Sequence, residues 1–213
     1  MIKVLRFHKN WRGFQEGSRI FFRPGVNLIV GDQGCGKSTI LSQIMAFNAS
    51  MAPKGSRQKK SWGESAVEVS GTPSPIGHFD FEKDNPRTQP AFGMSLGYDD
   101  GYQLSAMYAS HGEAVKPFLG MIEHVKGKVL LLDEPDMALS VRSITNLVKS
   151  LKSVTDEGQV ILSVHNETLI SSFPEVMSLE HGKWMSSEDF LKSQKTDDAP
   201  VFDRKSFRLV EIK

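Results

Sequence analysis

The stretch Val26-Asn-Leu-Ile-Val30-Gly31-Asp-Gln-Gly-Cys-Gly36-Lys37-Ser38-Thr39 sets the architecture of this chain. It begins with a short apolar run, passes through a glycine-rich turn and enters residues 37–47, whose apolar positions recur at helical spacing. The pattern predicts a strand, a tight loop and a helix. Residues 31–38 match G-x-x-x-x-G-K-[ST], in which backbone N–H groups surround a phosphate and the helix N-terminus adds its positive dipole. The sequence therefore predicts a phosphate-binding loop.

Within this loop, Lys37 is predicted to reach the β- and γ-phosphates of a nucleotide, and the Ser38 hydroxyl to bind Mg²⁺. Cys35 is interpreted as a small residue at a variable position. The alternative is a reactive thiol, with a pKa lowered at the helix N-terminus, whose oxidation would block nucleotide binding. The nucleotide-binding residues predicted here are Gly31, Asp32, Gln33, Gly34, Cys35, Gly36, Lys37, Ser38 and Thr39.

The remaining patterns alternate between strands and helices. This alternation predicts an α/β fold with a mostly parallel central sheet flanked by helices, and N-terminal antiparallel strands beside it. The predicted strands are residues 2–7, 19–22, 26–30, 76–81, 129–132, 159–164 and 175–179. The predicted later helices are residues 105–125, 141–151 and 167–173.

Composition narrows the class of protein. The 213 residues are predicted to form a single domain, 1–213, with a flexible basic loop at 48–75 and a C-terminal appendage at 182–213. The 26 basic and 25 acidic residues nearly cancel, which argues against a dominant non-specific attraction to nucleic acid or anionic membranes. No apolar run approaches the ~18 residues that a transmembrane helix needs. The single cysteine cannot form an internal disulfide. We therefore expect a cytoplasmic protein without membrane insertion.

A second motif lies at the end of the predicted strand 129–132. In Val129-Leu-Leu-Leu-Asp133-Glu134-Pro135, an apolar strand ends in two carboxylates. Asp133 is predicted to reach the Mg²⁺ shell, and Glu134 to act as the general base that polarises the attacking water. The alternative is a capped turn without a catalytic role.

The segment Ala109-Ser110-His111-Gly112-Glu113 resembles the Leu-Ser-Gly-Gly-Gln signature of the ATP-binding cassette (ABC) superfamily. Ser110 and Gly112 match its serine and second glycine, and Glu113 stands in place of glutamine. The number of residues between Ser110 and Asp133 is close to the usual separation in the family. The Ser-His-Gly-Glu form resembles the soluble branch that includes SMC and RecF-like ATPases. An ordinary helix cap, with Ser110 and Glu113 as a capping box, is compatible with this interpretation.

Two further residues extend the resemblance. His165 ends an apolar strand at the place of the family's switch histidine, which contacts the γ-phosphate, although a lone histidine is often structural. Residues 5–14 resemble the N-F-[RK]-x-F entry of SMC and RecF-like ATPases, which makes Arg12 a candidate phosphate contact or else an exposed turn residue. The family's Q-loop glutamine has no clear counterpart, and Asp80 or Glu82 is the candidate replacement.

The resemblance implies ATP hydrolysis with Mg²⁺ at a homodimer interface, where the signature of one copy closes over the nucleotide of the other. The interval between Lys37 and Ser110 is too short for a coiled-coil arm. Three roles stay open. The first is DNA repair, recombination or phage-related nucleic-acid metabolism, in which a basic cluster touches phosphate; the second is control of a separate effector such as a nuclease; the third is a transporter subunit. The basic cluster is Lys54, Arg57, Lys59 and Lys60, which an exposed solvated loop would also explain.

Overall fold

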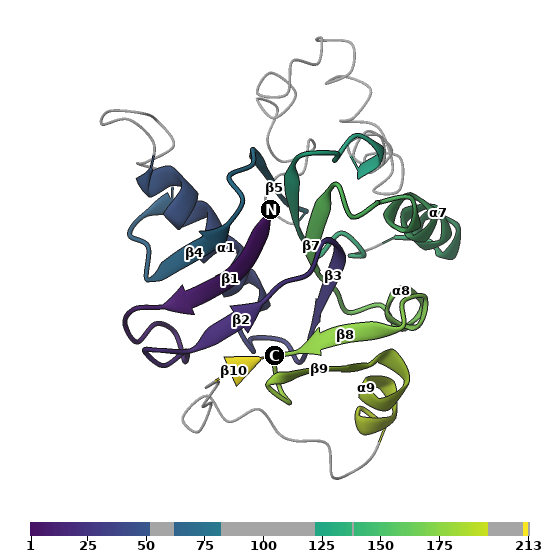
Figure 1. Ribbon diagram of the computed structural model, residues 1–213. Coiled ribbons are helices and arrows are strands. Elements are labelled where there is room, and N and C mark those ends of the chain that lie inside the picture. The colour runs from purple at the N-terminus through teal and green to yellow at the C-terminus, as the bar shows by residue number, and fades with distance from the viewer. Residues whose placement is uncertain (52–61, 82–121, 138, 196–210, 213) are drawn as a thin grey trace.

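The computed structural model describes residues 1–51, 62–81, 122–137, 139–195 and 211–212. These residues form two β-sheets with α-helices packed on them (Figure 1). The larger sheet has six strands in the order β5-β6-β7-β3-β8-β9, and the smaller has four in the order β10-β2-β1-β4. The fold is therefore the predicted α/β arrangement, a mostly parallel sheet with antiparallel N-terminal strands beside it.

Five strands of the larger sheet run parallel, and β9 is antiparallel to β8. In the smaller sheet β1 pairs antiparallel with β2 and β4, and β10 is parallel to β2. The strands are β1 (Ile2–Phe7), β2 (Arg19–Phe21), β3 (Gly25–Val30), β4 (Val67–Gly71), β5 (Ile76–Asp80), β6 (Val129–Asp133), β7 (Gln159–Ser163), β8 (Glu175–Ser178), β9 (Lys183–Ser186) and β10 (Glu211–Ile212). The helices are α1 (Lys37–Ser50), α7 (Val141–Lys152), α8 (Glu167–Ser171) and α9 (Ser187–Ser193).

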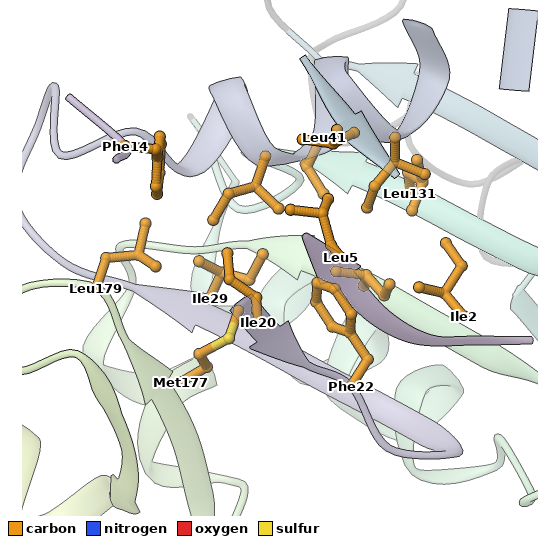
Figure 2. Packing of buried hydrophobic residues seen from close by; sticks show 14 of the residues in the cluster. Ile2, Leu5, Phe14, Ile20, Phe22, Ile29, Leu41, Leu131, Met177 and Leu179 are labelled. Atoms are coloured by element: carbon orange, nitrogen blue, oxygen red, sulfur yellow. The ribbon is translucent and has the colours of Figure 1, made fainter. Parts of the chain in front are cut away.

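The larger sheet is apolar on both faces, because successive side chains of a strand point to opposite sides. One set of alternating residues, including Ile29, Leu131 and Met177, packs against α1 and the smaller sheet. Figure 2 shows these side chains facing Leu5 and Leu41 across this core. The other set, including Leu132 and Leu162 among its members, packs against α7, α8 and α9. Helix α1 thus lies between the two sheets, in the position that brings its N-terminus to the loop after β3.

Strand order places the motif-bearing loops side by side. The neighbouring strands β6, β7 and β3 are parallel, so their C-terminal ends meet at one edge of the sheet. The glycine-rich loop leaves β3, residues 134–137 leave β6, and His165 follows β7. Ligands of open α/β sheets bind at the carboxyl ends of such strands.

Two predictions about irregular segments are wrong in part. Residues 48–50 continue α1, and β4, inside the predicted 48–75 loop, pairs with β1 along its length. Residues 183–186 form the edge strand β9, and the buried Phe190 of α9 joins the core, so this part of the predicted appendage belongs to the sheet. The sequence signal is weak, since apolar residues in this segment occur only as the pairs 184–185 and 190–191 within a polar stretch. In the described part of the chain, no helix has the length and apolar character needed to cross a membrane.

Candidate functional site

The glycine-rich loop after β3 turns where a Cβ would not fit. Gly36 precedes α1 with a φ of 108°, and a Cβ there would lie 2.8 and 2.9 Å from two ring carbons of Phe14. The Phe14 ring stacks on Phe7 with 4.5 Å between centroids. A Cβ on Gly31, whose φ is 142°, would lie 2.8 Å from Cys35 Sγ. Gly31 and Gly36 are therefore required both by their positive φ values and by the lack of space for a Cβ.

Lys37 is buried at the start of α1, with its ammonium inside the curve of the loop. Its Nζ donates hydrogen bonds to the carbonyl oxygens of Gly31 at 2.7 Å and Asp32 at 2.8 Å. The backbone N–H of Asp32 in turn donates to Glu180 Oε1, and Glu180 Oε2 accepts from Gln194 Nε2 at 2.9 Å. The loop is thus held from inside by its own lysine and from outside by a carboxylate that follows β8.

Cys35 is buried at 2% exposure beneath this loop. Its Sγ lies 3.8 Å from Lys37 Nζ. Burial raises the pKa of the Cys35 thiol, and this effect exceeds the opposite influence of the Lys37 ammonium. The alternative of a reactive thiol with a lowered pKa is therefore wrong, and Cys35 is a small packed residue.

Asp133 ends β6 and lies next to the loop. Its Oδ1 accepts hydrogen bonds from Ser38 Oγ at 3.0 Å and from Ser163 Oγ at 2.5 Å. Ser163 Oγ also accepts from the backbone N–H of Glu134 at 2.9 Å. In the adjoining strand β5, Asp80 is level with Asp133 in the parallel register. Oxygen atoms from three strands and α1 thus converge at this edge.

Glu134 and His165 face one another across the next loop. His165 Nε2 lies 3.3 Å from Glu134 Oε1, and both side chains are partly exposed. Glu134 has a φ of 52°, in the left-handed region that non-glycine residues rarely adopt. The backbone N–H groups of His165 and Asn166 donate to Asp136 Oδ2 at 2.7 and 2.6 Å.

The glycine-rich loop, the first residues of α1 and Glu134 border a cavity of about 410 Å³. Arg12, with a φ of 45°, lines it from the N-terminal segment. Gln33 is exposed outside this lining. The lining residues are Arg12, Gly13, Gly34, Gly36, Lys37, Ser38, Thr39 and Glu134.

The structure thus brings together Arg12, the loop residues Gly34, Gly36, Lys37, Ser38 and Thr39, and Asp133, Glu134 and His165. The other predicted loop residues, Gly31, Asp32, Gln33 and Cys35, do not line the cavity. Ser110, Gly112 and Glu113 of the signature, Glu82, and the basic residues Lys54, Arg57, Lys59 and Lys60 lie outside the described residues.

Sequence reasoning missed three polar residues that hold the site together: Ser163, Asp136 and Glu180. Ser163 and Asp136 each lie within three residues of a predicted site residue, so their proximity along the chain was an available signal. Glu180 lies far from the loop in sequence and has no such signal. Its contact with Asp32 depends on the pairing of β8 with β3.

Comparison with known proteins agrees with this arrangement. The family model described as AAA domain matches residues 8–195. A Pyrococcus horikoshii protein that carries the name ABC transporter ATP-binding protein is 25% identical over 98% of this chain and 92% of its own length.

Two solved structures share the fold at 14% identity and cover 91% of this chain. One is a metal-chelate type ABC transporter in an inward-facing conformation, with a TM-score of 0.54 and 87% of its chain covered. The other is cbiO1 from Clostridium perfringens, part of the ABC transporter complex cbiONQ, with a TM-score of 0.52 and 92% covered. The chain therefore belongs to the AAA domain family and is an ATPase, with similarity in sequence and fold to ATP-binding proteins of ABC transporters; membership of the family implies the use of ATP and Mg²⁺.

Proposed function

We propose that the edge formed by the loops after β3, β6 and β7 is the site of ATP hydrolysis. One observation carries this proposal: Lys37, Ser38 and Glu134 line the cavity in front of the glycine-rich loop, and Asp133 and His165 lie within hydrogen-bond distance of Ser38 and Glu134, respectively. Lys37 would hold the β- and γ-phosphates, together with N–H groups of the loop and the N-terminus of α1. Arg12, which also lines the cavity, would neutralise phosphate charge.

The oxygen atoms beside this cavity fit a magnesium ion. Ser38 Oγ and Asp133 Oδ1 are 3.0 Å apart, and hydroxyl and carboxylate oxygens are the donors that Mg²⁺ prefers. When bound, Mg²⁺ would neutralise charge on the phosphate oxygens. Ser38 and Asp133 are therefore the proposed metal ligands.

Glu134 is the proposed general base. Its carboxylate borders the cavity, so it can accept a proton from a water molecule that attacks the γ-phosphate. His165 Nε2, 3.3 Å from Glu134 Oε1, can donate a hydrogen bond that orients this carboxylate, or one that reaches the phosphate. General-base catalysis of this kind contributes roughly 10²- to 10⁴-fold to the rate.

We also propose that two copies close around two Mg-ATP. The Glu134 side chain is 30% exposed and that of His165 is 42% exposed, so one copy alone does not shield the reacting groups from water. A covering surface would exclude water and strengthen electrostatic interactions at the phosphates. A second copy of the chain supplies such a surface in the proposed arrangement, with Ser110 and Gly112 over the nucleotide.

For the biological role, we propose nucleic-acid metabolism of the kind served by SMC and RecF-like ATPases. The supporting observation is Arg12, which lines the cavity within the segment that resembles the entry of those ATPases. Control of a separate effector protein is the second candidate, because the 26 basic and 25 acidic residues nearly cancel and give no strong overall attraction to nucleic acid.

Light scattering tests the dimer. The Glu134→Gln variant should bind ATP without hydrolysing it and accumulate as a dimer with ATP but not with ADP. Ser110→Arg in the same background is the control and should stay monomeric. A Glu134→Gln variant that stays monomeric at saturating ATP would overturn the proposed dimer.

The role is tested by ATPase rates with and without DNA across a salt series. Stimulation that falls steeply with salt supports nucleic-acid metabolism, since phosphate contacts release counterions. No stimulation, together with co-purification of a soluble effector, would instead favour the second candidate. Recruitment to membranes by a partner would favour a transporter subunit.

A further inference from the structure

Asp136 is a buried acidic residue to which the proposed hydrolysis assigns no part. It lies two residues after Glu134 and is 8% exposed. A carboxylate at such a place is costly unless it is paired or hydrogen-bonded. The hydrogen bonds of Asp136 that compensate for this burial therefore indicate its function.

Those contacts are made with the loop that carries His165. Asp136 Oδ2 accepts the backbone N–H of His165 at 2.7 Å and that of Asn166 at 2.6 Å. Hydrogen bonds to a carboxylate are shorter and stronger than neutral ones. Among the described residues, Asp136 Oδ1 has no hydrogen-bond partner. Within the part of the chain that the structure describes, the hydrogen bonds that offset the burial of the Asp136 carboxylate thus come from the backbone of the loop after β7.

The same two loops carry Glu134 and His165, the pair proposed to act in hydrolysis. Glu134 Oε1 and His165 Nε2 are 3.3 Å apart. Glu134 has a φ of 52°, a backbone conformation that is strained for a residue with a side chain. A strained residue keeps its conformation only where its surroundings fix it. On one side Ser163 Oγ accepts the Glu134 N–H, and on the other Asp136 ties the following turn to the His165 backbone.

We propose that Asp136 is a positioning residue that sets the separation of Glu134 and His165. It acts by joining the loop after β6 to the loop after β7, and it does not touch the nucleotide. This inference rests on the proposed function, because it requires Glu134 and His165 to act in hydrolysis. It predicts an effect on turnover that exceeds any effect on ATP binding.

The test compares Asp136→Ala with Asp136→Asn. Asparagine keeps one oxygen that can accept both N–H groups, whereas alanine removes both acceptors. Asp136→Ala should lower kcat by roughly 10- to 100-fold, as expected when a catalytic group is displaced by about 1 Å. KM and the Kd of a fluorescent ATP analogue should stay at the values of the unsubstituted chain. Asp136→Asn should retain most of the turnover.

A double-mutant cycle separates positioning from general destabilisation. If Asp136 acts through the His165 loop, Asp136→Ala should cause little further loss of kcat in a His165→Ala background. Ser186→Ala, which removes the N-cap of the distant helix α9, is the stability control and should leave kcat unchanged.

Each failure has a distinct signature. Full kcat in Asp136→Ala, or losses from Asp136→Ala and His165→Ala that multiply independently, would overturn the positioning role. Full kcat in Glu134→Gln would instead overturn the proposed role of Glu134 as the general base, on which this inference rests.

Discussion

Ser163 donates its hydroxyl hydrogen to Asp133 Oδ1 at 2.5 Å, and both residues are buried at the ends of neighbouring strands. The same hydroxyl oxygen accepts the backbone N–H of Glu134 at 2.9 Å. One side chain of β7 therefore holds the proposed metal ligand and the backbone of the proposed base.

Ser163→Ala should lower both stability and turnover. It leaves the Glu134 N–H without its acceptor, and an unsatisfied buried group costs about 1–3 kcal/mol. Thermal melting and steady-state ATPase assays measure the two effects. Ser187→Ala is the matched control, because Ser187 is also buried and donates to Phe173 O at 2.6 Å, far from the cavity. Equal kcat losses in both variants would contradict a specific role of Ser163.

Gly36→Ala should weaken ATP binding at least about 10-fold, because binding geometry of this kind tolerates little displacement. The new Cβ would lie 2.8 Å from the Phe14 ring, and the φ of 108° adds backbone strain. Titration with a fluorescent ATP analogue measures the effect. Gly17→Ala is the control, since Gly17 has a φ of 87° but nothing within 4 Å of an added Cβ. If both variants bound ATP equally well, the contact with Phe14 would not shape the loop.

Cys35 should be slow to react in the folded chain at neutral pH. Burial raises the pKa of its thiol, so the neutral form is favoured when the chain is folded. The contribution of this thiol to stability is complete below its pKa in the unfolded chain and is lost as pH rises through the folded-state pKa. Urea unfolding of Cys35→Ala and the unsubstituted chain, from neutral to alkaline pH, should show the latter losing more stability. Alkylation of the folded chain as fast as the urea-unfolded chain would contradict this.

Phe190→Ala should destabilise the chain by about 3–5 kcal/mol, the usual cost of truncating a buried aromatic residue. Phe190 lies on α9, is 4% exposed and packs into the core on the face of the sheet opposite α1. Urea unfolding measures the loss. Lys192→Ala, on the exposed side of the same helix, should shift the midpoint far less. A small effect of Phe190→Ala would mean that residues 187–193 are indeed an appendage.

The sequence predicts the elements around the site well because their signals are local. Residues 28–30, 129–132 and 160–162 form continuous apolar runs typical of strands covered on both faces, and a motif residue follows each run within three positions. The contacts of Ser163 and Asp136 could not be predicted in the same way, because they depend on how β6 and β7 are aligned. Strand β9 was missed for a related reason: as an edge strand it carries a polar sequence, and its place depends on pairing with β8.

The central claim is that the Glu134 carboxylate, which lines the cavity and lies beside His165, is the general base of hydrolysis. Single-turnover hydrolysis of ATP by Glu134→Gln, at enzyme concentrations above the Kd of ATP, isolates this step from binding. The expected result is a rate at least about 100-fold below that of the unsubstituted chain, with the Kd of ATP unchanged. Hydrolysis at the full rate by Glu134→Gln would contradict the role of Glu134 as the base.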